Sequence, residues 1–439
     1  MGFIQTARWE LNRWSGNIKL FFLANILYQI GTGMFGVLYN LYIQELGYND
    51  AMNGRVVSIQ SLATAFLFVP IGLWGDRASR KKILIIGAMF SGAAFLLRSF
   101  ISGEAGLIGL AVFTGLFASF FQVLSIPFLA ENVKPKDRLR MFSYFSSLVL
   151  ASQVIGSMGG GLLADGLQAA GFSTLASLQT VLALGGSATF AAFIPMLFVR
   201  ERSSKGQALA DQDAKDPSST VAAENGSGSS SAKRAEESQT TGEFKTIGKF
   251  VAAQLLIGFG SGLVVPYLNL YFTNRFSASL SLMGILISLG QVMTIVSMLI
   301  GPTLARKVGQ VKAVVIFQML SLPFLLLTGF THWFAVAAVS FLFRQALMNA
   351  ANPIQSSIMI DRIADNRRGI ANSLTQTAFM LGWATMGPVQ SWLVTGYGSY
   401  WGYAITFSIT GCLYVVASLL YFFMFRKTSP ADARSAVEM

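Results

Sequence analysis

Residues 105–130 read AGLIGLAVFTGLFASFFQVLSIPFLA, an apolar run without a charged side chain. A helix needs about 20 predominantly apolar residues to cross the hydrocarbon core of a bilayer, and this run exceeds that length. Because the backbone in lipid must satisfy its own hydrogen bonds, an α-helix is the structure that such a segment can form. We therefore predict a membrane-spanning helix here.

Further segments of similar length and composition occur along the whole chain. The predicted spans are residues 18–43, 54–75, 82–101, 105–130, 141–165, 174–199, 246–273, 279–304, 312–330, 333–358, 369–393 and 399–425. The chain is 53% hydrophobic and 12% charged, whereas soluble proteins have about 25% charged residues. We expect an all-α integral membrane protein with twelve transmembrane helices.

The basic residues fix the expected orientation. With both termini in the cytoplasm, every one of the 32 Lys and Arg except Arg55, Arg98, Arg275 and Arg344 falls on the cytoplasmic side. Cytoplasmic loops of membrane proteins are enriched in Lys and Arg, so this asymmetry supports the number of spans and predicts cytoplasmic termini in a plasma-membrane protein. The net charge of +12 is explained by this excess of basic residues on the cytoplasmic side. Because no basic stripe interleaves with stacking aromatic residues, we expect no nucleic-acid partner.

The segment between the sixth and seventh spans is rich in small and charged residues and has almost no large apolar ones. It cannot bury a core, so a disordered cytoplasmic linker is expected. The predicted domains are a cytoplasmic N-terminal segment (1–17), a six-helix bundle (18–200), the linker (201–244), a second six-helix bundle (245–426) and a cytoplasmic tail (427–439).

The two halves share short motifs at a constant offset of 229 positions. Asn40-Leu41-Tyr42 recurs as Asn269-Leu270-Tyr271, and the pair Gly31 and Gly33 recurs as Gly260 and Gly262. Internal repeats of this kind are how many secondary transporters are built. The repeat predicts two pseudo-symmetric bundles.

A conspicuous loop motif follows the second span: Gly72-Leu-Trp-Gly-Asp76-Arg77-Ala-Ser-Arg80-Lys81-Lys82. It resembles the signature loop between helices 2 and 3 of the major facilitator superfamily, with Trp74 in place of the usual Leu and Ser79 in place of the second Gly. The resemblance extends to the twelve spans and the central linker. It implies the fold of that family, transport by alternating access, and a likeness to bacterial twelve-helix drug and metabolite exporters.

The resemblance also implies a conformational latch that holds the cytoplasmic side shut in one state. A plain basic loop is the alternative. The second-half copy has Ala305 where an Asp would stand, so the first copy should dominate. After helix 4, Glu131 is followed seven positions later by Arg138, and after helix 10, Asp361 is followed seven positions later by Arg368. The resemblance implies that these pairs belong to the same cytoplasmic charge network. The expected latch residues are Gly72, Asp76, Arg77, Arg80, Lys81, Glu131, Arg138, Asp361 and Arg368.

Helix 5 has a glycine-rich stretch, Gly156-Ser-Met-Gly-Gly160-Gly161, that resembles the helix-5 motif of antiporters, with Ser157 in place of Pro. It favours an exporter. Ordinary glycine-mediated helix packing by Gly156, Gly160 and Gly161 is the alternative.

In the family, helices 1, 4, 7 and 10 line the central cavity, so polar residues on them are candidate ligands. Arg344 lies well inside the tenth span, where a charge is costly unless it faces a cavity or a partner. Snorkelling to the outer interface is the alternative for Arg344, if the span begins later in the sequence. Asn40 and Asn269 are related by the repeat, so a structural role is an equal alternative for them. Arg98 is expected to snorkel to the outer interface. The candidate cavity residues are Gln29, Thr32, Asn40, Gln122, Asn269, Arg344, Gln345, Asn349 and Asn352.

No Asp or Glu falls near a membrane midplane, so no intramembrane proton relay is predicted and a coupling ion stays open. Arg344 without an acid favours an anionic, zwitterionic or neutral substrate. Cys412 is the only cysteine, and no nucleotide-binding loop or catalytic constellation occurs; we expect no metal, no cofactor, no enzyme activity and a monomer. The function expected is secondary transport of a small organic solute, with export favoured. An organic-anion uniporter that uses Arg344, and a flippase for lipids or lipid precursors, remain alternatives.

Overall fold

The computed structural model describes residues 14–133, 137–200, 229–363 and 367–425, and all of its regular structure in these ranges is helical. The first half contains α2 (Gly16–Glu45), α3 (Asp50–Arg77), α4 (Arg80–Arg98), α5 (Glu104–Asn132), α6 (Arg138–Ala169), α7 (Thr174–Ala191) and α8 (Phe193–Phe198). The second half contains α10 (Ser229–Val264), the 3₁₀ turn η2 (Val265–Tyr267), α11 (Leu268–Phe276), α12 (Leu280–Val308), α13 (Gln310–Phe330), α14 (Phe334–Ala350), α15 (Asn352–Arg362) and α16 (Arg368–Phe425).

Ten helices of the described chain are long and apolar enough to cross a membrane. Two features of the helices account for the difference from the twelve spans predicted. Gly398 has a φ of 75°, which interrupts the helical conformation and divides the 58-residue α16 into two spans. Helix α4 begins with Arg80, Lys81 and Lys82 and ends at Arg98, so its 19 residues are less apolar than the other spans. The helices are therefore consistent with twelve spans.

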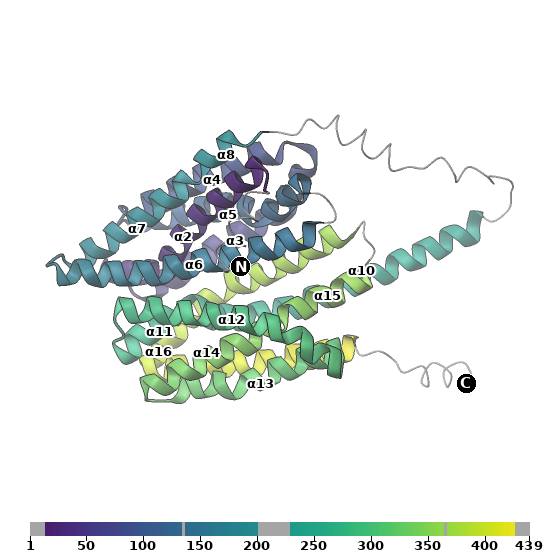
Figure 1. Ribbon diagram of the computed structural model, residues 1–439. Coiled ribbons are helices and arrows are strands. Elements are labelled where there is room, and N and C mark those ends of the chain that lie inside the picture. Colours follow the sequence, from purple (N-terminus) through teal and green to yellow (C-terminus); the bar gives the residue numbers. More distant parts are fainter. Residues whose placement is uncertain (1–13, 134–136, 201–228, 364–366, 426–439) are drawn as a thin grey trace, which may run out of the picture.

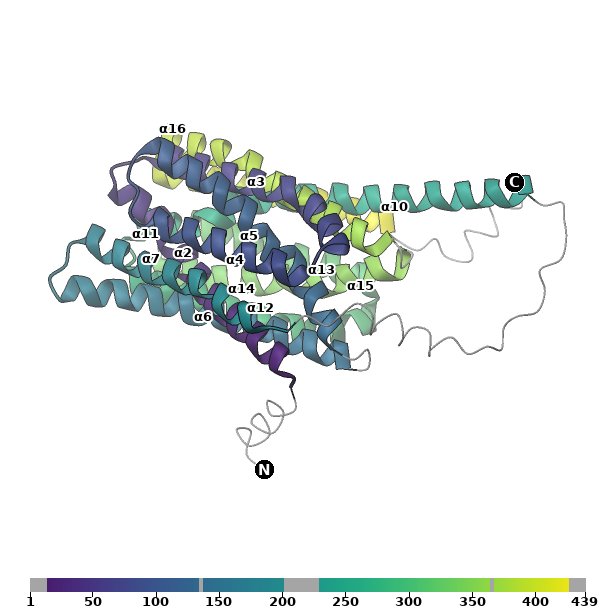
Figure 2. The same ribbon diagram turned by 90° about the horizontal axis from the view of Figure 1, so that it is seen from above.

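Three spans are broken where the sequence disfavours a continuous helix. The seventh span passes through the 3₁₀ turn η2, where Pro266 lacks the N–H that an α-helix would use. The tenth span breaks between α14 and α15, just before Pro353. The sixth breaks at Ala192. Helix α10 begins at Ser229, inside the segment predicted to be a disordered linker, and Figures 1 and 2 show it projecting beyond the bundles.

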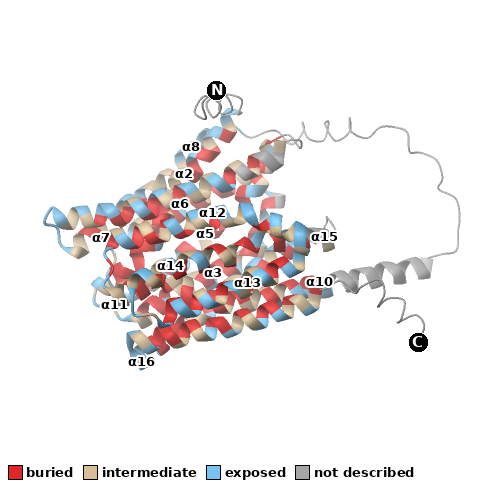
Figure 3. Ribbon diagram, turned by 60° about the horizontal axis from the view of Figure 1, so that its bottom comes forward, coloured by how far each residue is buried: buried red, intermediate tan, exposed pale blue. Residues whose placement is uncertain are grey.

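The helices form two bundles, drawn in purple to blue and in green to yellow in Figure 1. We call the end of the bundles at which α8 ends and α10 begins the linker end, and the opposite end the far end. Buried residues face the inside of the bundles, and exposed ones lie on outward faces and at the tips (Figure 3). Exposed apolar side chains such as Phe66, Leu299 and Phe423 suit helices surrounded by lipid.

The apolar core differs between the two ends. At the far end, one cluster of buried residues joins both halves and includes Tyr39 and Tyr42 of the first half and Tyr267 and Tyr271 of the second. At the linker end there are two separate clusters, one formed by the first half and one by the second. Among the residues that the structure describes, the bundles therefore share a core at the far end and not at the linker end.

Candidate functional site

At the far end the two bundles are joined by a reciprocal pair of hydrogen bonds between α2 and the seventh span. The Asn40 side-chain amide donates to the Pro266 carbonyl at 2.6 Å, and the Asn269 amide donates to the Val37 carbonyl at 2.9 Å. The Asn40 amide also lies 3.3 Å from the Asn269 side-chain oxygen. Both side chains are buried. From the sequence, Asn40 and Asn269 are candidate cavity residues with a structural role as the alternative. The structure places both side chains in a contact between the bundles, which fits the structural role.

Close backbone contacts surround this pair. A Cβ on Gly54 of α3 would lie 2.7 Å from the Gly387 carbonyl of α16, so only glycine permits this approach. A Cβ on Gly161 of α6 would collide with the Leu280 carbonyl of α12. The Asp165 carboxylate accepts a 2.8 Å hydrogen bond from the backbone N–H of Ser281 in the first turn of α12, where the helix dipole favours an anion. The far end is closed by these contacts.

At the linker end the bundles approach less closely. A Cβ on Gly72 of α3 would lie 3.8 Å from the Ser373 hydroxyl of α16, an ordinary van der Waals distance. A cavity of about 300 Å³ lies within the second bundle on the linker side of the Asn40–Asn269 contact. Its walls come from α10, α15 and α16: Phe250, Ala253, Gln254, Ile257, Asn352, Gln355, Ser356, Met359, Asn372, Thr375, Gln376, Phe379 and Tyr421.

The predicted cavity residues of α14 and α15 do not form one ligand face. Arg344 is only 4% exposed; its guanidinium donates to the Tyr414 hydroxyl at 3.0 Å and to the Gln345 side-chain oxygen at 3.1 Å. The Asn349 amide is bonded to the Gln345 carbonyl at 2.8 Å. Of the residues predicted for the cavity, Asn352 alone is among its lining residues.

Polar residues predicted on the first bundle form a small group of their own. The Gln153 amide of α6 donates to the Gln29 side-chain oxygen of α2 at 2.9 Å, and the Thr32 hydroxyl donates to the same oxygen at 3.1 Å. Gln122 is exposed on α5. Gln153 was not predicted, although its place one helical turn before Gly156 and Ser157 puts it on the face of α6 that packs against α2.

The prediction that Arg98 snorkels is wrong. Arg98 is 2% exposed, lies 3.9 Å above the ring of Tyr39 and donates to the Gln60 side-chain oxygen at 2.7 Å. The position at the end of α4 suggested an interfacial cation, but the aromatic face and the amide give the guanidinium partners inside the bundle.

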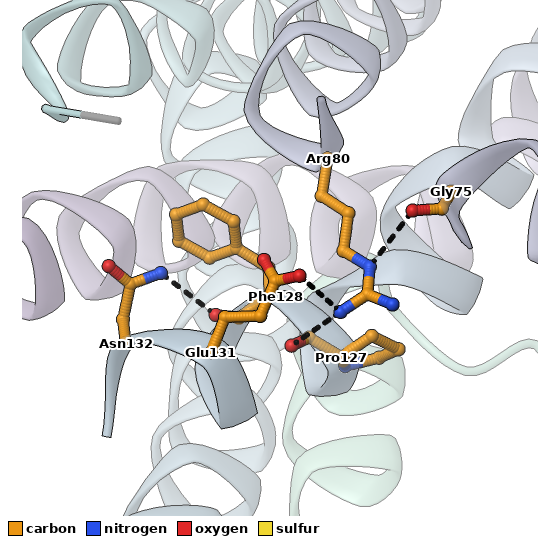
Figure 4. Close-up of polar contacts among 6 residues, drawn as sticks. All are labelled: Gly75, Arg80, Pro127, Phe128, Glu131 and Asn132. Atoms are coloured by element: carbon orange, nitrogen blue, oxygen red, sulfur yellow. Dashed lines mark hydrogen bonds and ion pairs between the residues drawn. The ribbon is translucent and has the colours of Figure 1, made fainter. Parts of the chain in front are cut away.

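The signature loop forms contacts within the first bundle. The Arg80 guanidinium pairs with Glu131 of α5 at 2.6 Å and donates to the carbonyls of Gly75 and Pro127 at 3.1 and 3.4 Å, as Figure 4 shows. Lys81 donates to the Leu197 carbonyl of α8 at 3.1 Å. Arg80 thus ties the start of α4 to the ends of α3 and α5. The side chains of Asp76, Arg77, Arg138, Asp361 and Arg368 lie outside the described part of the structure, so their latch role stays a prediction.

The glycines of the helix-5 stretch lie at close contacts between helices. A Cβ on Gly156 would collide with the Ile30 carbonyl of α2, and one on Gly160 would lie 3.1 Å from Met34. Gly161 faces α12, as described above. These positions fit the packing alternative, because each glycine lets a neighbouring helix approach.

Comparisons with known proteins agree with this architecture. The sequence model of the Major Facilitator Superfamily matches residues 21–246 and 250–438. An uncharacterised MFS-type transporter of Methanocaldococcus jannaschii is 27% identical over 150 residues, a match that spans 34% of this chain and 39% of that protein.

Solved structures share the fold at low sequence identity. The chain resembles the nucleoside transporter NupG (TM-score 0.69, 14% identity, 94% of this chain and 99% of that one). It also resembles a bacterial homologue of the human lysosomal transporter Spinster in an inward-facing, unoccupied conformation (TM-score 0.71, 13% identity, 94% of this chain and 98% of that one). A third similar structure is the D-xylose-proton symporter (TM-score 0.71, 16% identity, 94% of this chain and 97% of that one).

Proposed function

Because the chain belongs to the Major Facilitator Superfamily, we propose that it is a secondary transporter that moves a small organic solute across the plasma membrane by alternating access, and that it works as an exporter. The observation that carries the proposal is the asymmetry between the two ends. The bundles share a core and direct hydrogen bonds at the far end, whereas an amide-lined cavity lies on the linker side of that contact.

The charge distribution gives the orientation that we propose. Cytoplasmic loops are enriched in basic residues. In the described chain, basic residues gather at the helix ends of the linker end: Arg80, Lys81, Lys82, Arg200, Arg306, Lys307, Lys312 and Arg362. The linker end would then face the cytoplasm, and the structure would represent an inward-open state with the outer gate shut. A solute from the cytoplasm would reach the cavity directly.

The reverse state requires that the far-end contacts break and that the linker end closes. The Arg80–Glu131 pair keeps the ends of α3, α4 and α5 together, so these helices can move as one body in that step. A signature-loop latch through Asp76 is the contact we propose for the closed cytoplasmic side. Export rests on the resemblance of the helix-5 glycines to those of antiporters.

Transport and direction are tested with the purified full chain in proteoliposomes and in oriented membrane vesicles. Counterflow of radiolabelled sugars, nucleosides, amino acids and organic acids should show at least one solute that accumulates above protein-free liposomes. Inside-out vesicles should accumulate that solute more than right-side-out vesicles do, and the reverse preference would contradict export. An imposed pH gradient, applied in the same assay, decides whether protons are the coupling ion.

A further inference from the structure

The cavity of the second bundle is lined by several side-chain amides. Five of its residues are amides, from three different helices: Gln254 of α10, Asn352 and Gln355 of α15, and Asn372 and Gln376 of α16. Ser356 and Thr375 add hydroxyls to the same walls. On α15, Asn352, Gln355 and Ser356 follow the spacing that puts residues on one helix face.

Most of these amides lack a partner. In the described part of the chain, the side chains of Gln254, Gln355, Asn372 and Gln376 form no hydrogen bond with protein atoms. Gln355 is only 8% exposed. Gln254 is half-buried, and Asn372 and Gln376 are exposed on the cavity side of the described chain. A primary amide offers two donors and an acceptor, so each of these side chains presents unused hydrogen-bonding groups. The cavity therefore offers hydrogen-bonding groups that a solute can take over from water.

The cavity walls have no formal charge. Among the described residues that line it, none is Asp, Glu, Lys, Arg or His. Arg344 on α14 is not among them, and its guanidinium is already bonded to Tyr414 and Gln345. An ion in this cavity would lose part of its hydration without gaining an opposite charge, which is unfavourable. The cavity therefore favours an uncharged solute over a charged one.

Aromatic side chains complete the walls. Phe250, Phe379 and Tyr421 line the cavity together with the amides. An aromatic face packs well on the apolar face of a ring, while amides bond to groups at the ring edge. The volume of about 300 Å³ is at the lower end of the usual range for ligand pockets.

We infer that this cavity binds an uncharged ring compound with several hydroxyl groups, such as a monosaccharide or a nucleoside, through Gln254, Gln355, Asn372 and Gln376. The inference names the solute class of the proposed transporter and so rests on that proposed function. It makes the amides of α10, α15 and α16, and not Arg344, the determinants of specificity.

The test is binding to the purified full chain in detergent, measured by thermal shift and by equilibrium dialysis. The probes are D-glucose, uridine, succinate and tetraethylammonium. D-glucose or uridine should raise the melting temperature, and whichever does so identifies the source of the hydroxyl groups. Gln355→Leu and Gln376→Leu should each weaken binding about tenfold or more, because each removes a hydrogen-bonding group that the solute uses.

Gln168→Leu is the matched control: this glutamine lies on α6 at the far end and does not line the cavity, so its replacement should leave affinity unchanged. Gln355→Asn, which keeps the amide, shows whether a loss in Gln355→Leu reflects folding. The inference is overturned if neither uncharged probe binds, if a charged probe binds better, or if the Leu variants bind as the parent does. Counterflow of some other solute would leave the transporter proposal standing in each case.

Discussion

Asn40 and Asn269, which are 229 positions apart, each donate a side-chain hydrogen bond to a backbone carbonyl of the opposite bundle. Their acceptors, Val37 and Pro266, are separated by the same offset. The two bonds are thus related by the internal repeat. They bind the halves only where the first and seventh spans touch, so they can exist only while the far end is closed.

Asn40→Ala should therefore favour opening of the far end. The change removes the bond to Pro266 and the contact with Asn269, each of which contributes about 0.5–1.5 kcal/mol when buried. A cysteine introduced at the far end should react with a thiol reagent, applied from outside, at least about fivefold faster than in the parent. The reason is that a change of about 1 kcal/mol in the free energy of opening changes the open population about fivefold. The parent for this assay needs Cys412→Ala, because Cys412 is exposed. Unchanged reactivity would refute a gating role for the pair.

Gly54→Ala should have a larger effect in the same direction. The added methyl group would lie 2.7 Å from the Gly387 carbonyl, so the far end cannot close without a backbone shift. We expect slower transport and a lower melting temperature. Gly109→Ala on α5 is the control, because nothing lies within 4 Å of its Cβ position. Equal behaviour of the two variants would show that the glycine contact is not needed for closure.

Arg344→Gln should preserve transport of an uncharged solute to within about threefold. Replacing Arg344 removes a buried cation whose partners are neutral, and a fully desolvated charge of this kind is costly to keep. Loss of all transport in Arg344→Gln, with the melting temperature unchanged, would restore Arg344 as a substrate ligand.

Tyr414→Phe should lower the free energy of unfolding by about 1 kcal/mol, because the hydrogen bond to Arg344 is lost.

Arg80→Ala should lower thermal stability more than Glu131→Gln does. Glu131 is partly exposed, and such ion pairs contribute about 0.2–1 kcal/mol. Arg80 also bonds to the carbonyls of Gly75 and Pro127, which lose their donor in Arg80→Ala. Thermal unfolding of the two single variants checks the order. Equal losses would mean that the ion pair alone matters.

Much of the architecture could be predicted from the sequence, because apolar length and basic loops act locally. The break at Gly398 agrees with the boundary predicted between residues 393 and 399. The offset of 229 already related Asn40 to Asn269, but their contact depends on how the bundles meet. Arg344 shows the limit most clearly, since its partner Tyr414 is 70 positions away and depends on how α14 packs on α16.

Most of the cavity was not predicted. The candidates came from helices 1, 4, 7 and 10, which left out the eleventh span, and this span supplies Asn372, Thr375 and Gln376. A signal was present, because Asn372, Thr375, Gln376 and Phe379 repeat at intervals of three and four, the spacing of one helix face.

The central claim is that the two ends open alternately, and distances between spin labels test it most directly. In the Cys412→Ala chain, one pair at Ala169 and Ser399 reports the far end, and a second at Lys82 and Lys312 reports the linker end; all four positions are exposed. Adding Asn40→Ala should lengthen the far-end distance and shorten the linker-end distance in the same sample. Distances that stay fixed at both ends, or that lengthen together, would contradict alternating access.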